Sequence, residues 1–130
     1  MKAKKAELEY RLKIVPYTDT QKGIEGHLFE LSTLTEFRTF KYEILVDTEV
    51  EDTSIYLTIQ GISTPQFSIP EHGPAFFRTV INNLHGEREV VVSKTTGPKS
   101  KFVVRFTPKK TIRKGRAKKA FVEIETTHKE

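Results

Sequence analysis

The segment between Pro108 and Lys119 has the highest density of positive charge in the sequence and contains no acidic residue. Its seven basic residues are Lys109, Lys110, Arg113, Lys114, Arg116, Lys118 and Lys119. Cations held this close repel one another, and the phosphates or carboxylates of a partner relieve that repulsion. We therefore expect this segment to bind an anionic protein or nucleic-acid surface. The alternative is a solvated loop that the rest of the molecule partly neutralises.

Nothing in this segment would read a nucleotide sequence. Only Ile112 interrupts the charges, and base stacking requires aromatic side chains. The aromatic strand from Phe102 to Phe106 lacks the Gly-aromatic-Gly element that precedes such strands in RNA-recognition motifs, so we interpret both Phe residues as core. If the segment binds nucleic acid, it contacts phosphates and not bases.

Two other groups of residues could in principle support chemistry. Four carboxylates lie within six residues of a predicted hairpin turn: Asp47, Glu49, Glu51 and Asp52. They lack the glycine and the late bidentate Glu of an EF-hand, so we expect solvated charges and no metal. The four histidines are His27, His72, His85 and His128, and their spacing matches no metal or catalytic motif.

The sequence does not predict an enzyme. It has no Cys and no Ser in a nucleophile elbow, and we expect no cofactor. The one arrangement that would change this expectation is a pocket that joins His72 and His85 with the neighbouring carboxylates.

The net charge of +5 comes from this one basic segment. Without it, the acidic residues slightly outnumber the basic ones. The basic N-terminal hexapeptide, residues 1–6, is followed by charged residues where a signal peptide would be apolar. No apolar run is long enough to span a bilayer, so we expect no membrane insertion and a cytoplasmic location.

Apolar residues recur with period two along most of the chain, which is typical of β-strands with one buried face. Leu8, Tyr10, Leu12 and Ile14 alternate with charged residues, and later runs repeat the pattern. The later runs are 40–46, 55–59, 90–92, 102–106 and 120–124, with a weaker one at 26–31. The acidic stretch 48–53 and the Gly97-Pro98 turn each predict a hairpin.

Two segments depart from this pattern. Phe76, Phe77, Val80, Ile81 and Leu84 follow helical spacing, which predicts a short helix near residues 74–85, although these residue types equally suit a strand. Residues 66–69 lie between Pro65 and Pro70, which indicates an edge strand.

Residues 1–130 therefore form a single mainly β domain with a basic loop at 108–119. We expect an antiparallel immunoglobulin-like β-sandwich of about seven strands, with a Greek-key barrel as the alternative. A parallel sheet would need crossover helices that the sequence does not show.

The function expected from these features is that of a non-catalytic interaction module whose basic loop contacts an anionic partner. One alternative is a barrel that binds nucleic acid without sequence preference, with Lys94, Lys99 and Lys101 extending its positive surface. Another is a structural subunit of a homo-oligomer that takes no ligand.

Overall fold

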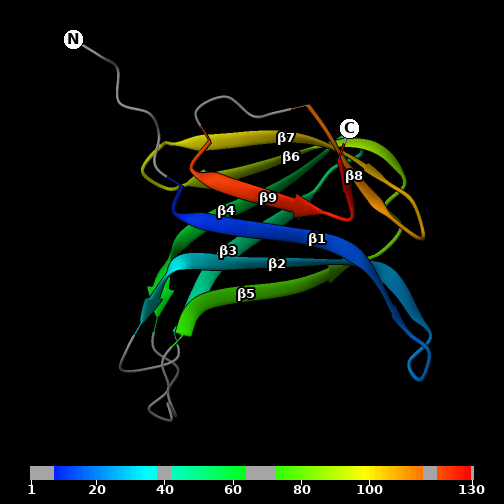
Figure 1. Cartoon of the computed structure of the whole chain (residues 1–130), viewed down its shortest axis with the longest axis horizontal. Coiled ribbons are helices and arrows are strands. Elements are labelled where there is room, and N and C mark those ends of the chain that lie inside the picture. Colours follow the sequence, from blue (N-terminus) through cyan, green and yellow to red (C-terminus); the bar gives the residue numbers. More distant parts are fainter. Residues whose placement is uncertain (1–7, 38–41, 64–72, 116–119, 130) are drawn as a thin grey trace.

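The computed structural model describes residues 8–37, 42–63, 73–115 and 120–129 and contains ten β-strands and no helix in these ranges (Figure 1). The first five strands are β1 (Tyr10–Asp19), β2 (Ile24–Phe37), β3 (Glu43–Val50), β4 (Ser54–Ser63) and β5 (Gly73–Ile81). The others are β6 (Gly86–Lys94), β7 (Lys99–Phe106), β8 (Thr111–Lys114), β9 (Val122–Thr126) and β10 (His128–Lys129).

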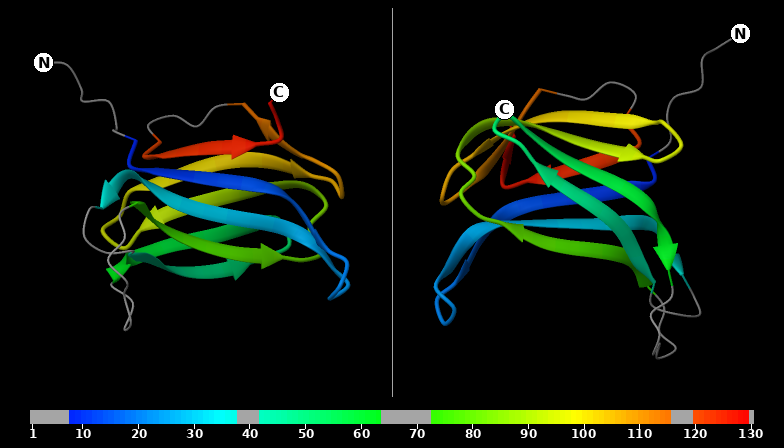
Figure 2. Two further views of the ribbon diagram at one scale, coloured as in Figure 1. Left: turned by 60° about the horizontal axis from the view of Figure 1, so that its bottom comes forward. Right: turned by 180° about the vertical axis from the view of Figure 1, so that it is seen from behind.

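All ten strands belong to one sheet, in the order β10-β8-β7-β6-β4-β3-β5-β2-β1-β9. The sheet curls until its two edges nearly meet, so the molecule is a nearly closed barrel (Figure 2). The sheet is mixed. The β1–β9, β3–β5, β4–β6 and β8–β10 pairs are parallel, and the remaining pairs are antiparallel.

The C-terminal segment joins the two edges of the sheet. β9 pairs with β1 at one edge of the sheet, and after a bend at Thr127 β10 pairs with β8 at the other edge. At the bend, the Thr111 amide donates to the Thr127 hydroxyl, and the Thr127 amide donates to the Thr111 hydroxyl. The Thr127 hydroxyl donates to the Thr111 carbonyl, and the Thr111 hydroxyl donates to the Ile14 carbonyl at 2.6 Å. Thr111 is fully buried, so this network replaces water at the seam between β8 and β1.

The hydrophobic core fills the inside of the barrel. β7 contributes every second residue to it, whereas β6 buries the three consecutive valines Val90, Val91 and Val92. The largest fully buried apolar side chains come from six strands: Leu12, Ile14, Phe29, Leu31, Ile55, Leu57, Val90, Val92, Val104, Phe106 and Val122.

The structure confirms most of the elements predicted from period two. Leu12 and Ile14 are buried on β1, the acidic stretch joins β3 and β4, and the Gly97 turn joins β6 and β7. In the closing strand, Phe121 is buried as well as Val122 and Ile124, so the alternation predicted there does not hold for Phe121. The predicted edge strand at residues 66–69 lies outside the described residues.

The predicted helix at residues 74–85 is wrong. Residues 73–81 form β5, which pairs antiparallel with β2, and the Phe76 side chain lies opposite Ser32. Asn83, with a φ of 62°, lies in the connection that leads from β5 to β6. Leu84, the last residue of the supposed helical face, is buried in that connection. Aromatic and β-branched residues favoured the strand once a partner strand was available.

The expected two-sheet sandwich is not confirmed, because every described strand belongs to one curled sheet. Among the described residues no helix is present, and so none of a length that could cross a membrane.

Candidate anion-binding surface

The predicted basic loop is built on a β-hairpin. β7 and β8 pair antiparallel from Val103 opposite Lys114 to Phe106 opposite Thr111. Residues 111–114 are therefore a strand and not part of a long loop. β8 is shorter than β7. Its two charged residues, Arg113 and Lys114, are adjacent in sequence and therefore lie on opposite faces of the sheet.

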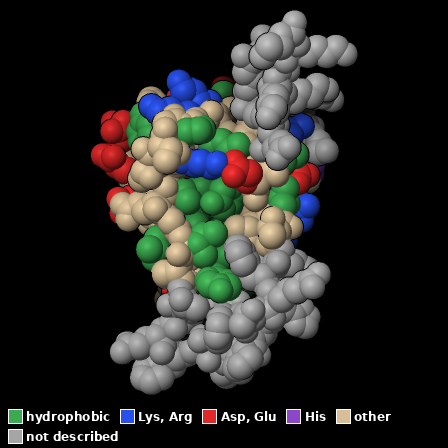
Figure 3. All heavy atoms as spheres, turned by 90° about the vertical axis from the view of Figure 1, so that its left-hand side faces the viewer, with side chains coloured by type: hydrophobic (Ala, Val, Ile, Leu, Met, Phe, Trp, Pro, Cys, Tyr) green, Lys and Arg blue, Asp and Glu red, His purple; other side chains and the backbone are tan. Residues whose placement is uncertain are grey.

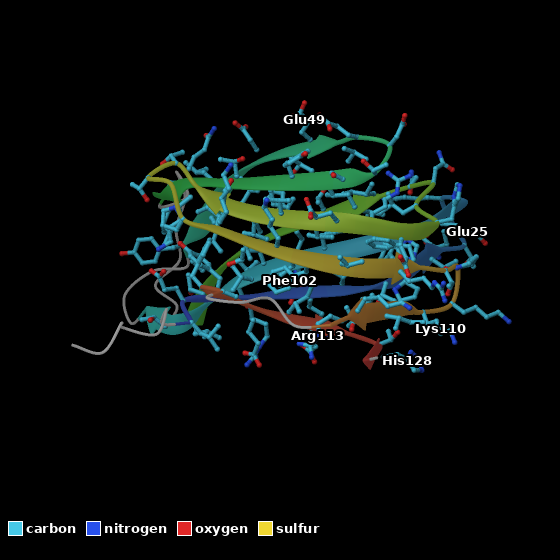
Figure 4. The ribbon with its side chains drawn as sticks, turned by 90° about the horizontal axis from the view of Figure 1, so that it is seen from above. Glu25, Glu49, Phe102, Lys110, Arg113 and His128 are labelled. Atoms are coloured by element: carbon cyan, nitrogen blue, oxygen red, sulfur yellow. The ribbon has the colours of Figure 1, made fainter. Side chains whose placement is uncertain are left out.

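The turn between these strands presents two lysines. The Thr107 amide donates to the Lys110 carbonyl, and the Lys110 amide donates to the Thr107 hydroxyl, both at 3.0 Å. Pro108 and Lys109 lie between these bonded residues. Lys109 and Lys110 are exposed, and Figure 4 shows Lys110 near one end of the barrel.

The outer face of the hairpin carries further cations. On β7, Lys99, Lys101 and Arg105 are exposed, whereas the residues between them point into the core or, in the case of Val103, stay on the outer face. Lys114 lies opposite Val103, and therefore between Lys101 and Arg105 on the same face.

One carboxylate partly neutralises this face. Glu87 of β6 accepts ion pairs from Arg105 at 3.8 Å and from Lys114 at 3.4 Å. Its side chain is 48% exposed, and such surface pairs contribute about 0 to 1 kcal/mol each, so they do not bind these cations tightly. Glu89 lies on the same face of β6, opposite Val103. Two carboxylates thus face the six cations of the outer face and turn: Lys99, Lys101, Arg105, Lys109, Lys110 and Lys114.

Arg113 lies on the other face of β8. Alternation places it with buried Thr111, opposite Val104, which is fully buried. The side chain is half-buried, and its Nε atom is buried without a hydrogen-bond partner. The structure therefore separates Arg113 from Lys114 and from the outer face.

The seven predicted residues have three outcomes. Lys109, Lys110 and Lys114 share one surface, Arg113 does not, and Arg116, Lys118 and Lys119 lie outside the described residues.

Lys94, which the alternative hypothesis added to this surface, is engaged elsewhere. It pairs with Glu9, and its Nζ atom lies 4.9 Å from the centre of the Phe121 ring.

Sequence reasoning missed Arg105 as a surface cation. Its alternation with Val104 and Phe106 was the available signal. Recognising Thr111–Lys114 as a strand paired with β7 would have placed Arg105 beside Lys114 on one face.

Beneath the turn, His27 connects the barrel interior to the hairpin. Its Nε2 atom lies 2.8 Å from the Thr107 carbonyl, and its ring packs edge-on against Phe106 with centroids 5.0 Å apart. The ring is 3% exposed, and Nδ1 has no hydrogen-bond partner. Burial lowers the pKa of His27 below 6.5, and the bond to Thr107 only partly opposes this effect. His27 is therefore a neutral structural residue that donates from Nε2.

The other groups considered for chemistry do not assemble in the part of the chain that the structure describes. No three His, Asp or Glu residues there are arranged to hold a metal ion. Asp47, Glu49, Glu51 and Asp52 are exposed along the β3–β4 hairpin. His85 is exposed, and its proposed partner His72 lies outside the described residues.

Hydrophobic side chains gather at the end of the barrel where β1 and β7 begin (Figure 3). Lys94, at the end of β6, lies against Phe121 and Glu9 of this region. This combination indicates packing at a barrel end.

The comparisons with known proteins give no further guidance. No family model, no curated protein and no solved structure matches this chain.

Proposed function

We propose that this protein is a non-catalytic binding module whose basic β7–β8 surface contacts an anionic macromolecule. This surface consists of Lys99, Lys101, Arg105, Lys109, Lys110 and Lys114. The single observation that carries the proposal is the presence of these six cations on one hairpin, of which only Arg105 and Lys114 form ion pairs, both with Glu87, among the described residues.

The geometry favours recognition of charge over recognition of sequence. The exposed outer face of β7 offers Val103 between cations and no aromatic ring. Flat arrays of Lys and Arg bind phosphates or carboxylates, whereas base readout needs stacking or groove contacts.

Binding to labelled polyanions tests this proposal. The probes are a short DNA duplex of random sequence and polyglutamate, each at about 50 and 200 mM salt. We expect affinity to fall steeply with salt. Binding of the DNA duplex would support a nucleic-acid partner. Binding of polyglutamate alone would support an acidic protein partner.

Two matched variants locate the binding surface. Lys101→Glu with Lys110→Glu should weaken binding at least about tenfold and reduce the salt slope by about 2, because two anion contacts are lost. Lys13→Glu with Lys22→Glu changes the net charge equally at exposed positions elsewhere and should have a much smaller effect. Equal losses in the two variants, or no binding by the wild type at low salt, would contradict the proposal.

A further inference from the structure

The barrel has an open edge between β3 and β5. Only one residue pair, Glu43 opposite Phe76, joins these two strands. Beyond this pair the strands part, as the right-hand view of Figure 2 shows. Residues 44–50 of β3 pair only with β4, and residues 77–81 of β5 pair only with β2, among the described residues. Alternate backbone groups along both facing edges therefore have no strand partner in the described part of the chain.

The β5 edge lacks the features that usually protect an open strand. Edges are commonly blocked by proline, by free lysines or by bulges. Residues 77–81 contain no proline, and the bulge in the β2–β5 pairing precedes them. The one charged residue, Arg78, pairs with Glu30 at 2.6 Å and lies 4.6 Å from the centre of the Phe76 ring. Thr79, Val80 and Ile81 are β-branched and favour pairing.

The inner side of this edge is apolar. The register with β2 places Phe77 and Ile81 on the same face as Leu31 and His27, and both side chains remain half-buried. The shallow hollow of about 250 Å³ at the fork has a mixed lining, with apolar Ile44, Phe76 and Phe77 beside charged Glu43 and Arg78. An extended segment along β5 would direct every second side chain toward Phe77 and Ile81.

The β3 side of the gap is acidic on its outer face. Across the gap from Arg78, which pairs with Glu30, β3 carries Asp47 and Glu49, both exposed. Asp47 accepts a hydrogen bond from Gln60, and no cation of the described residues forms an ion pair with Asp47 or Glu49. The remaining side chains of an added strand would face this negative charge.

We propose that the edge of β5 from Phe77 to Ile81 binds an extended partner peptide in which apolar residues alternate with basic ones. The peptide adds a strand to β5, its apolar side chains contact Phe77 and Ile81, and its basic side chains face Asp47 and Glu49. This site differs from the basic β7–β8 surface in position and in the charge of its partner, so each proposal stands or fails separately.

Three synthetic peptides test the site with the full chain. The first alternates Val and Lys, the second has the same sequence with alternate backbone amides N-methylated, and the third alternates Val and Glu. Fluorescence anisotropy measures affinity, and hydrogen exchange of the bound protein locates the contact. We expect the Val/Lys peptide alone to bind and to slow exchange in β5.

Charge reversal on β3 identifies the determinant of specificity. Asp47→Lys with Glu49→Lys should weaken binding of the Val/Lys peptide at least about tenfold and create affinity for the Val/Glu peptide. Glu51→Lys with Asp52→Lys makes the same charge change at the hairpin turn and should retain the original preference. If circular dichroism shows that the variant with Asp47→Lys and Glu49→Lys is unfolded, Asp47→Asn with Glu49→Gln provides the milder test. It should still weaken binding of the Val/Lys peptide.

The site is overturned by absence of Val/Lys binding, by equal binding of the N-methylated peptide, or by equal effects of the two reversed pairs. The Lys101→Glu, Lys110→Glu variant should bind the Val/Lys peptide as the wild type does. That result separates failure at β5 from failure at the basic surface.

Discussion

The imidazole of His27 lies inside the barrel, with Nε2 bonded to Thr107 and Nδ1 without a partner. Protonation would place an uncompensated charge next to Phe106 and Ile81. On the face of each neighbouring strand that points toward His27, β1 offers Ile14, Pro16 and Thr18, and β5 offers Thr79 and Ile81. Glu25 on β2 and the two lysines of the β7–β8 turn are charged but exposed.

This environment predicts a loss of stability in mild acid. Because the pKa of His27 is lower in the folded state, its contribution is complete above about pH 6.5 and declines as the pH falls from 6.5 toward the folded value. Urea unfolding at several pH values should show this decline in the wild type and a weaker decline in His27→Gln. Parallel pH dependences in the two proteins would contradict this role.

The hydroxyl of Thr111 predicts a second effect of a single residue. Thr111→Val keeps the shape of the side chain but leaves the Ile14 carbonyl and the Thr127 amide each without one partner. Leaving a buried group unsatisfied costs about 1 to 3 kcal/mol, so the free energy of unfolding should fall by at least that amount. Thr111→Ser retains the hydroxyl and should cost less. Equal losses in the two variants would show that the hydroxyl does not stabilise the seam.

At the level of elements, the close approach of β2 to the end of β5 depends on Gly26. A Cβ atom at this position would lie 2.5 Å from Asn82 Oδ1 and 2.8 Å from the Ile81 carbonyl. Gly26→Ala should therefore destabilise the protein by about 1 to 3 kcal/mol through overpacking. Gly61 on β4 has no atom within 4 Å of its Cβ position, so Gly61→Ala should be close to neutral in the same thermal unfolding experiment. Similar losses would contradict this account.

The strands that the sequence predicted are those whose pattern is local. Leu12 and Ile14 alternate with charges, so their strand is evident without knowledge of its partners. β5 was misjudged because Phe76, Phe77, Val80 and Ile81 satisfy the spacing of a helix and also fill two faces of a strand. Pairing with β2, distant in sequence, decides between these structures, and no local pattern reports it.

The basic β7–β8 surface was predictable in part for a related reason. Lys109 and Lys110 are conspicuous as a charge run, and they are exposed as expected. The division between Lys114 and Arg113 follows from the β7–β8 register, which the run of charges concealed. The same register places Arg105 on the outer face beside Lys114.

For the whole molecule, charge is distributed unevenly around the barrel. Glu49 of the β3–β4 hairpin and Lys110 of the β7–β8 turn lie on opposite sides in Figure 4. Within the sheet, β6 lies between the two hairpins. A polyanion would therefore be attracted to the β7–β8 side and repelled by the β3–β4 side, which would orient it before contact.

Chemical-shift mapping of the isotopically labelled protein, during titration with a short random-sequence DNA duplex and then with polyglutamate, tests the central claim most directly. The account predicts that at least one polyanion shifts the amides of Lys99–Phe106 and Thr107–Lys114, and that the shifts disappear at high salt. Shifts centred on another face, or no shifts with either polyanion at low salt, would contradict the assignment of the β7–β8 hairpin as an anion-binding surface.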